Sequence, residues 1–148
     1  MTTIRERFLS LVSKFDWLPG LLSRLTLGFI FIQSGWGKLH HLDKVIGFFT
    51  SLGIPAPRLQ APFVAAVEFG CGGLVLLGLA TRLASIPLIG TVGVAILTAK
   101  LKDVSDLSGF LSLSEYLFVA LLVWLIVKGA GALSIDFFLA RKFGRGDR

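Results

Sequence analysis

The sequence predicts an all-α membrane protein built as an antiparallel bundle of four transmembrane helices. The first observation is composition: 54% of the 148 residues are hydrophobic, and the mean hydropathy is +0.81. The second is that the apolar runs are bounded by short segments rich in charge, glycine and proline. Because a hydrocarbon core of about 30 Å requires about 20 largely apolar residues in a helix, four such runs predict four spans. The whole chain, residues 1–148, is expected to form a single domain.

The four predicted spans follow one another closely. The run LLSRLTLGFIFIQSGW predicts a span over about residues 18–37, and PFVAAVEFGCGGLVLLGLA predicts one over about 61–80. The run LASIPLIGTVGVAILTA predicts a third span over about 83–100, and the short link before it requires an antiparallel hairpin with the second. YLFVALLVWLIV, extended back through LSLSE, predicts the fourth over about 112–128.

Amphipathic segments flank the bundle. Near the N-terminus, apolar residues recur at helical spacing between charged ones, which predicts an amphipathic helix on the membrane surface. These apolar residues are Ile4, Phe8, Leu11, Val12 and Phe15. After the fourth span, Gly129 and Gly131 suit a helix end, and Ser134 and Asp136 suit the start of another helix. A short C-terminal interfacial helix is therefore expected.

The basic residues predict the orientation of the bundle. With four spans, both termini and the link between the second and third spans lie on one side, and most of the 15 Lys and Arg residues fall there. The positive-inside rule therefore places both termini in the cytoplasm. Anionic headgroups account for the net charge of +6, so the lipid bilayer is the expected partner and no nucleic-acid partner is predicted.

The chain has few side chains suited to redox chemistry or metal binding. Its single cysteine, Cys71, excludes a disulfide-exchange pair within the chain and suits a packing role. His40 and His41 are adjacent in the first outer loop, which does not suit haem ligation within the membrane. With Asp43 they are conceivable metal ligands, but adjacent histidines on a short loop are more often solvated, so no metal site is predicted.

Ionisable residues share helical faces in the first two spans. Arg24 and Lys38 lie on one face of the first span, and Glu68 and Arg82 lie on one face of the second. Glycines on these faces allow helices to approach closely in lipid, so both faces are expected to contact other helices. Helical rise places Glu68 about 9 Å from Lys38 and about 12 Å from Arg24 along the bundle. Lys38 is the expected partner, with Arg24 as an alternative.

A carboxylate within the membrane costs about 2.5–3.5 kcal/mol on insertion scales, so Glu68 is a functional candidate. One interpretation is an ion pair that holds the helices in register. Another is a protonated carboxyl group that transfers protons or binds a lipophilic headgroup. Snorkelling toward the interface is a third.

Two other acids have open roles. Glu115 begins the fourth span, level with Lys38 and Glu68, where it is either an acid suited to the helix N-terminus or a second carboxylate beside the same pocket. Asp136 is expected on the same side as Arg82, where it can close a cytoplasmic ion pair.

Taken together, these segments resemble the DoxX family of small four-helix bacterial membrane proteins. The resemblance runs from about residue 23 to residue 139 and rests on the order and spacing of RLTLGFIFIQSGWGKL, SLGIPAP, VEFGCGGLVLLGLATRLA and GAGALSID. It implies a four-helix bundle in the bacterial inner membrane. Members of the family are linked to the small membrane subunit of thiosulfate:quinone oxidoreductase and to oxidoreductase complexes that handle thiols and oxidative stress. The charged positions that match the family's pattern are Arg24, Lys38, Glu68, Arg82 and Asp136.

The leading hypothesis is an accessory or quinone-docking subunit of a membrane oxidoreductase. Glu68, Lys38 and Arg24 would offer a charged pocket to a quinone headgroup, with Glu68 as the candidate proton carrier. Electrons would come from a partner subunit, and no covalently bound cofactor is expected. The alternatives are a non-catalytic membrane anchor or assembly protein, and a homo-oligomeric transport component for a small solute in which Glu68 is a protonatable gate. Beyond a subunit role, enzymatic activity is left open.

Overall fold

The computed structural model describes residues 13, 15–101, 104, 106–131 and 133–143, and every regular element in these ranges is helical. The predicted N-terminal amphipathic helix falls almost wholly outside the described residues. The elements are α2 (Leu18–His40), α3 (Leu42–Ser51), α4 (Pro57–Leu77), α5 (Thr81–Ala95), the π-helical turn η1 (Ile96–Lys100), α6 (Leu107–Leu111), α7 (Ser114–Lys128) and α8 (Ile135–Phe143). The predicted all-helical class is confirmed for the described part of the chain.

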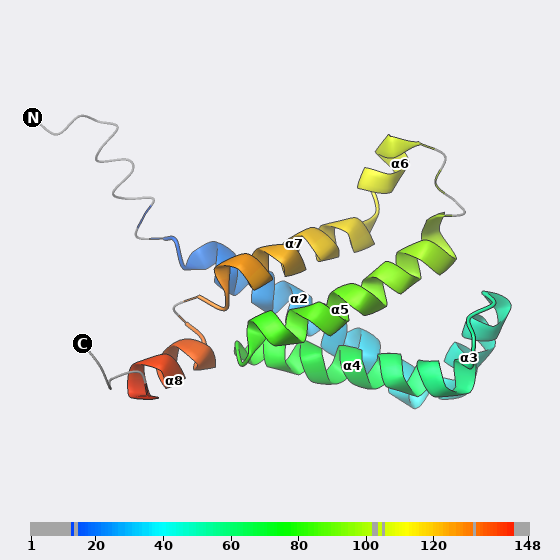
Figure 1. The fold of residues 1–148 in the computed structure, drawn as a ribbon, viewed down its shortest axis with the longest axis horizontal. Coiled ribbons are helices and arrows are strands. Elements are labelled where there is room, and N and C mark those ends of the chain that lie inside the picture. Colours follow the sequence, from blue (N-terminus) through cyan, green and yellow to red (C-terminus); the bar gives the residue numbers. More distant parts are fainter. Residues whose placement is uncertain (1–12, 14, 102–103, 105, 132, 144–148) are drawn as a thin grey trace, which may run out of the picture.

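The long helices α2, α4, α5 and α7 run back and forth along the molecule (Figure 1). α3 and α6 lie in the connections at one end of the molecule, and α8 follows α7 at the other. α2 packs along α4, α4 against α5, and α5 against α7, while α2 also contacts α7. The long helices therefore overlap the four segments for which the sequence predicts spans.

Two helical stretches among the described residues are long and apolar enough to cross a membrane by length and composition. They are Pro57–Leu77 and the continuous stretch Thr81–Lys100. α7 has only 15 residues, which corresponds to about 22 Å of rise against a core of about 30 Å. α2 has 23 residues but includes Arg24 and Lys38. Membrane crossing by α2 and α7 therefore stays a prediction.

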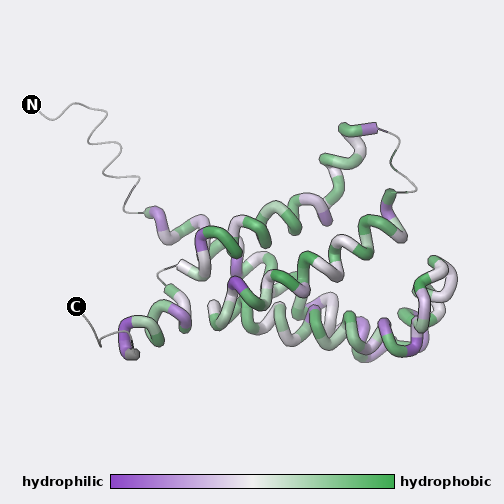
Figure 2. The backbone as a smooth tube through the Cα atoms, viewed as in Figure 1, coloured by the Kyte–Doolittle hydropathy of each residue, from purple (hydrophilic) through white to green (hydrophobic). Residues whose placement is uncertain are grey.

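Large apolar side chains cover the outside of the long helices. Leu83, Leu97 and Val127 are between 67% and 71% exposed. Figure 2 shows hydrophobic residues along α5 and α7 and hydrophilic residues at the ends of these helices. An apolar surface of this kind is unfavourable in water but is at no disadvantage among lipid chains. The surface agrees with a lipid environment.

The core lies where the four long helices meet. Leu27, Leu88, Leu122 and Leu125 come from α2, α5 and α7 and are fully buried. Cys71 of α4 is partly buried and packs against this cluster. Its position matches the packing role that the sequence predicts for it.

Glycines allow α2 and α4 to approach each other closely. A Cβ atom added to Gly35 would lie 2.8 Å from the carbonyl oxygen of Ala65, and one added to Gly72 would lie 2.9 Å from the backbone nitrogen of Ile32. Real Cβ atoms do not approach other atoms so closely, so only glycine fits without a shift of the helices. The expectation that these glycine faces contact another helix is confirmed, and the contact brings α2 beside Glu68.

A tight turn joins α4 and α5, as the predicted hairpin requires. Gly78 and Ala80 adopt left-handed backbone conformations, with φ of 70° and 47°. The carboxylate of Asp136, in the first turn of α8, accepts hydrogen bonds from the backbone nitrogens of Ala80 at 2.7 Å and Thr81 at 3.2 Å. The Asp136 nitrogen donates to the Gly78 carbonyl at 3.0 Å. Asp136 therefore closes the turn and attaches α8 to it.

Candidate functional site

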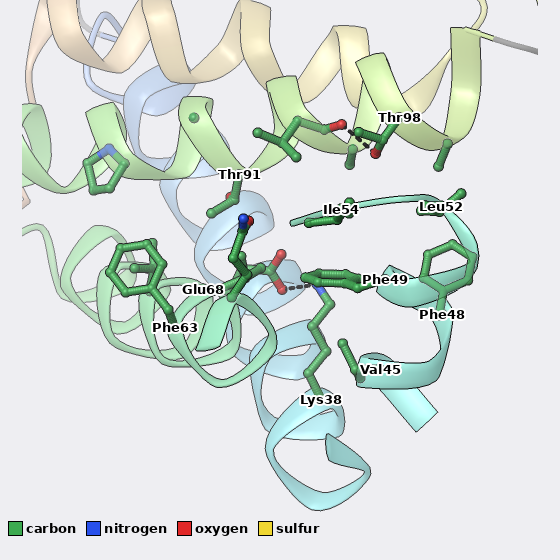
Figure 3. A pocket seen from close by; sticks show the side chains of 18 of the residues that line it. Lys38, Val45, Phe48, Phe49, Leu52, Ile54, Phe63, Glu68, Thr91 and Thr98 are labelled. Atoms are coloured by element: carbon green, nitrogen blue, oxygen red, sulfur yellow. Dashed lines mark hydrogen bonds and ion pairs between the residues drawn. The ribbon is translucent and has the colours of Figure 1, made fainter. Parts of the chain in front are cut away.

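A cavity of about 650 Å³ lies between α2, α3, α4, α5 and η1. Most of its wall is apolar, and the aromatic part of it is contributed by Phe48, Phe49 and Phe63. Figure 3 shows Lys38 and Glu68 on one wall, with Thr91 and Thr98 on the opposite helix. Small-molecule sites in proteins have volumes of about 300–1,000 Å³ and combine apolar walls with a few polar groups. The cavity has the size and character of such a site.

Glu68 is the centre of a polar cluster on the cavity wall. Its Oε2 atom forms an ion pair with Nζ of Lys38 and accepts a hydrogen bond from Oγ of Ser34 at 2.8 Å. Nζ of Lys38 also donates to Oγ of Ser34 at 3.1 Å. The Glu68 side chain is only 8% exposed, whereas that of Lys38 is 27% exposed. The structure thus brings Lys38 and Glu68 together, and the carboxylate is the more deeply buried partner.

The two carboxylate oxygens of Glu68 have different surroundings. Both polar contacts are made to Oε2, on the side of α2. Oε1 points away from Lys38, and Glu68 is part of the cavity lining (Figure 3). One oxygen is therefore held by the protein, while the other faces the space that a ligand would occupy.

The position of Glu68 on α4 follows from the helical repeat. It belongs to the buried face of α4, which consists of Ala61, Ala65, Glu68, Gly72 and Val75. Small residues on this face leave room beside the carboxylate, because α2 approaches without large side chains in between. On α2, Ser34 and Lys38 are four residues apart and lie on one face, so both reach the same oxygen.

α3 forms a wall of the cavity that the sequence analysis missed. The sequence predicts an outer loop after the first span, whereas the structure has a helix there whose residues Val45, Phe48 and Phe49, followed by Leu52, line the cavity. Their spacing of three, one and three residues is a helical pattern that could have revealed this amphipathic helix. Ser34 is not among the predicted site residues, because a serine within an apolar run is common and gives no distinctive signal.

The opposite wall ends in an irregular helix. Residues Ile96–Lys100 continue α5 as a π-helical turn, in which Thr98 and Ala99 line the cavity. The hydroxyl groups of Thr91 and Thr98 donate to the carbonyls of Leu88 and Val94 of the same helix. π-Helical turns inside α-helices frequently occur at functional sites.

Arg24 does not belong to this site. Its Nη1 donates to the carbonyl of Ala130 and its Nη2 to that of Leu133, both at 2.7 Å. The guanidinium lies against Gly78, which is about 15 Å beyond Glu68 at the helical rise of α4. The structure therefore does not bring Arg24 to Glu68, and Arg24 instead holds the connection between α7 and α8.

The remaining predicted site residues lie at the two ends of the bundle. Glu115 pairs with Lys100 at 3.3 Å, joining η1 to the start of α7, and is not part of the cavity lining. Arg82 donates from Nη2 to the carbonyl of Val127 at 3.4 Å. Asp136 accepts from backbone nitrogens in the α4–α5 turn, rather than from an arginine side chain.

The adjacent histidines hydrogen-bond to the preceding turn of their own helix. Nδ1 of His40 donates to the carbonyl of Trp36 at 2.9 Å, and Nδ1 of His41 donates to that of Gly37 at 3.0 Å. The ring of His40 also packs on Trp36, with the ring centroids 4.2 Å apart. Through these contacts, both histidine rings are held against the C-terminal end of α2.

Sequence comparison identifies the family. The DoxX family model matches residues 20–101. The chain is 34% identical over 131 residues to a protein named "Uncharacterized membrane protein Rv3486" from Mycobacterium tuberculosis, with 80% of each chain covered. It is 35% identical over 121 residues to "Putative oxidoreductase CatD" of Bacillus subtilis, covering 80% of this chain and 85% of CatD.

A further relative is the inner membrane protein YqjF of Escherichia coli, which is 31% identical over 135 residues, covering 89% of this chain and all of YqjF. No solved structure matches the chain. The family match covers α2 from residue 20 onward and all of α3, α4, α5 and η1, which are the elements that surround the cavity. On this evidence the chain belongs to the DoxX family of membrane proteins.

Proposed function

We propose that this protein is a membrane subunit that docks a quinone in the cavity beside Lys38 and Glu68. The observation that carries the proposal is the cavity itself: about 650 Å³, with apolar and aromatic walls and one buried ion pair at its side. A quinone has an apolar ring and tail and carbonyl oxygens that accept hydrogen bonds. The match between such a molecule and this lining favours a quinone over a polar metabolite.

The ion pair suits the chemistry of quinone reduction. Reduction to the quinol takes up two electrons and two protons, and negative charge develops on the quinone oxygens. The ammonium of Lys38 stabilises that charge, and the Glu68 carboxylate takes up each proton from water before passing it to a quinone oxygen. Ser34 contacts both groups and holds them in position.

Electrons come from a partner subunit on this proposal. The chain has one cysteine, and its two histidines bond to the carbonyls of their own helix, so the redox centre is assigned to another protein. The relative CatD carries the name of an oxidoreductase, which agrees with a role in such a complex. The protein is then an accessory subunit rather than a complete enzyme.

The proposed setting is the bacterial inner membrane, with four spans and both termini in the cytoplasm. The relative YqjF of Escherichia coli is named as an inner membrane protein. In this orientation, the Lys38–Glu68 cavity lies toward the outer side, and the α4–α5 turn that Asp136 closes lies toward the cytoplasm.

Binding of a short-tailed benzoquinone or naphthoquinone to the purified protein in lipid nanodiscs tests the proposal. Glu68→Gln keeps the shape of the side chain but removes the charged acceptor for a quinol hydroxyl, so affinity for the reduced, quinol form is expected to fall about tenfold, equivalent to about 1.4 kcal/mol. Glu115→Gln is the matched control, since its carboxylate lies outside the cavity. Affinities are compared per folded molecule, as judged by thermal unfolding. Equal affinity of the wild type and Glu68→Gln for the quinol would contradict the proposal.

A non-catalytic anchor is the second candidate, favoured by the close contact of α2 and α4. In that case the Lys38–Glu68 pair holds these helices together, and the cavity needs no ligand. The double variant Lys38→Gln with Glu68→Gln then restores assembly with partner subunits that either single variant impairs. On the quinone proposal, the double variant recovers stability but not quinone binding.

A further inference from the structure

A second hollow lies at the other end of the bundle, away from the Lys38–Glu68 cavity. It has a volume of about 590 Å³ and is bounded by the start of α5, the end of α7 and the connection to α8. Arg82 and Lys128 line it together with the backbone around Gly129. None of its lining residues belongs to the lining of the first cavity. We call it the α5–α7 groove.

The charge of the α5–α7 groove is positive. Among the described residues, neither Arg82 nor Lys128 forms an ion pair with a carboxylate. Asp136 also borders the groove, but both of its carboxylate oxygens accept hydrogen bonds from the backbone of the α4–α5 turn. Two cations therefore face the groove, and its one acid is already engaged.

Both cations are held at the C-terminal end of α7. Nη2 of Arg82 donates to the carbonyl of Val127 at 3.4 Å, and its guanidinium lies beside Gly129. Nζ of Lys128 lies 5.5 Å from the ring centroid of Trp124. The negative end of the α7 dipole favours cations here. The guanidinium retains other N–H groups with which it can bind an anion.

Exposed apolar side chains surround the cations. Leu83 is 71% exposed, Val127 67% and Trp124 43%. Leu83 lines the groove on α5, and Val127 is exposed on the last turn of α7, where its carbonyl accepts from Arg82. Tryptophan is enriched at the level of lipid headgroups. The combination of two cations with an apolar surface fits an amphiphile whose head is anionic.

We propose that the α5–α7 groove binds the phosphate of an anionic phospholipid, with Arg82 and Lys128 as donors and the acyl chains along Leu83 and Val127. A guanidinium matches the geometry of a phosphate, and a lysine adds a point charge. The headgroup of a zwitterionic lipid also carries a positive group, which Lys128 would repel. Anionic lipids are therefore preferred. This proposal is independent of quinone docking, because the two sites share no lining residue.

The test is native mass spectrometry of the purified protein with equal amounts of phosphatidylglycerol and phosphatidylcholine of the same acyl composition. The wild type is expected to retain phosphatidylglycerol in preference to phosphatidylcholine. Each of Arg82→Gln and Lys128→Gln reduces this preference about fivefold. One basic residue near an anionic lipid surface strengthens binding by about this factor. Arg82→Lys keeps the charge and most of the preference. Thermal unfolding confirms that the variants are folded.

Arg58→Gln and Arg141→Gln are the matched controls, the first near the start of α4 and the second on α8. Both remove one positive charge outside the groove and leave the preference unchanged. An equal loss in these controls would show general attraction between charges and overturn the proposal, as would a wild type without preference. Inorganic phosphate is the competing ligand: if phosphate alone displaces phosphatidylglycerol at equal concentration, the groove is an anion site and the lipid proposal is wrong.

Discussion

At the scale of single residues, Glu68 is kept inside the bundle by a cation and a hydroxyl group. Lys38 and Ser34 both bind the same carboxylate oxygen. Their common position on α2 and the small residues of α4 make this contact possible. The sequence predicts the pair from axial distance. It does not show that Oε1 faces a cavity, because the cavity is formed by residues of α2, α3, α4, α5 and η1.

The two partners of the ion pair differ in burial, and this predicts unequal effects on stability. Lys38→Gln leaves the more buried Glu68 carboxylate unpaired and is expected to destabilise the protein by about 2–4 kcal/mol. Glu68→Gln leaves the more exposed Lys38 ammonium, which water reaches more easily, and is expected to cost about 1–2 kcal/mol. Denaturant titration in detergent micelles measures both. A larger loss for Glu68→Gln than for Lys38→Gln would contradict the assigned burial.

Arg24 shows that two cations on one face of the same helix can have different roles. The sequence places Arg24 on the face of α2 that also carries Lys38, which suggests a common pocket. In the structure its guanidinium binds two backbone carbonyls of the α7–α8 connection. These acceptors come from residues more than 100 positions away in the chain, so no local pattern predicts them.

At the scale of elements, the contact between α2 and α4 determines the geometry of the site. Gly28, Gly35 and Gly72 lie where the two backbones meet. The sequence predicts glycine-rich contact faces, but it does not show which glycines are in contact. Gly70 and Gly73 lie on the same helix as Gly72, and a Cβ on either would meet nothing within 4 Å.

Two glycines of α2 provide a direct test of this contact. A Cβ on Gly35 would lie 2.8 Å from the Ala65 carbonyl oxygen, whereas one on Gly37 would meet nothing within 4 Å. Gly35→Ala is therefore expected to destabilise the protein by about 1–3 kcal/mol through overpacking. Gly37→Ala is expected to be neutral or stabilising, since alanine favours the helix. Thermal unfolding of both variants checks this, and equal midpoints would refute the close contact.

At the scale of the whole molecule, the buried polar contacts described above lie at opposite ends of the bundle. The Lys38–Glu68 cavity lies toward the end that carries α3, and the Arg24 and Asp136 contacts lie toward the end that carries α8 (Figure 1). The apolar outer surface lies between them. This distribution fits a bundle with one functional face on each side of a membrane.

The proposed orientation is testable with single cysteines in a Cys71→Ala background. Thr50→Cys on α3 is expected to react with a membrane-impermeant maleimide in intact cells, because the proposed orientation places α3 on the outer side. Ala140→Cys on α8 is expected to react only after the inner membrane is permeabilised. Both positions are exposed, so burial does not limit the reaction. The reverse labelling pattern would show that the termini face outward.

The sequence by itself determined the helical class, the approximate positions of the long helices, the α4–α5 hairpin and the resemblance to the DoxX family. These features depend on local composition and periodicity, which a single chain displays directly. Only the tertiary structure decided that α3 closes a cavity against α5, that Ser34 joins the ion pair and that Arg24 lies elsewhere. Such contacts join residues far apart in the sequence, and they depend on how closely the helices pack.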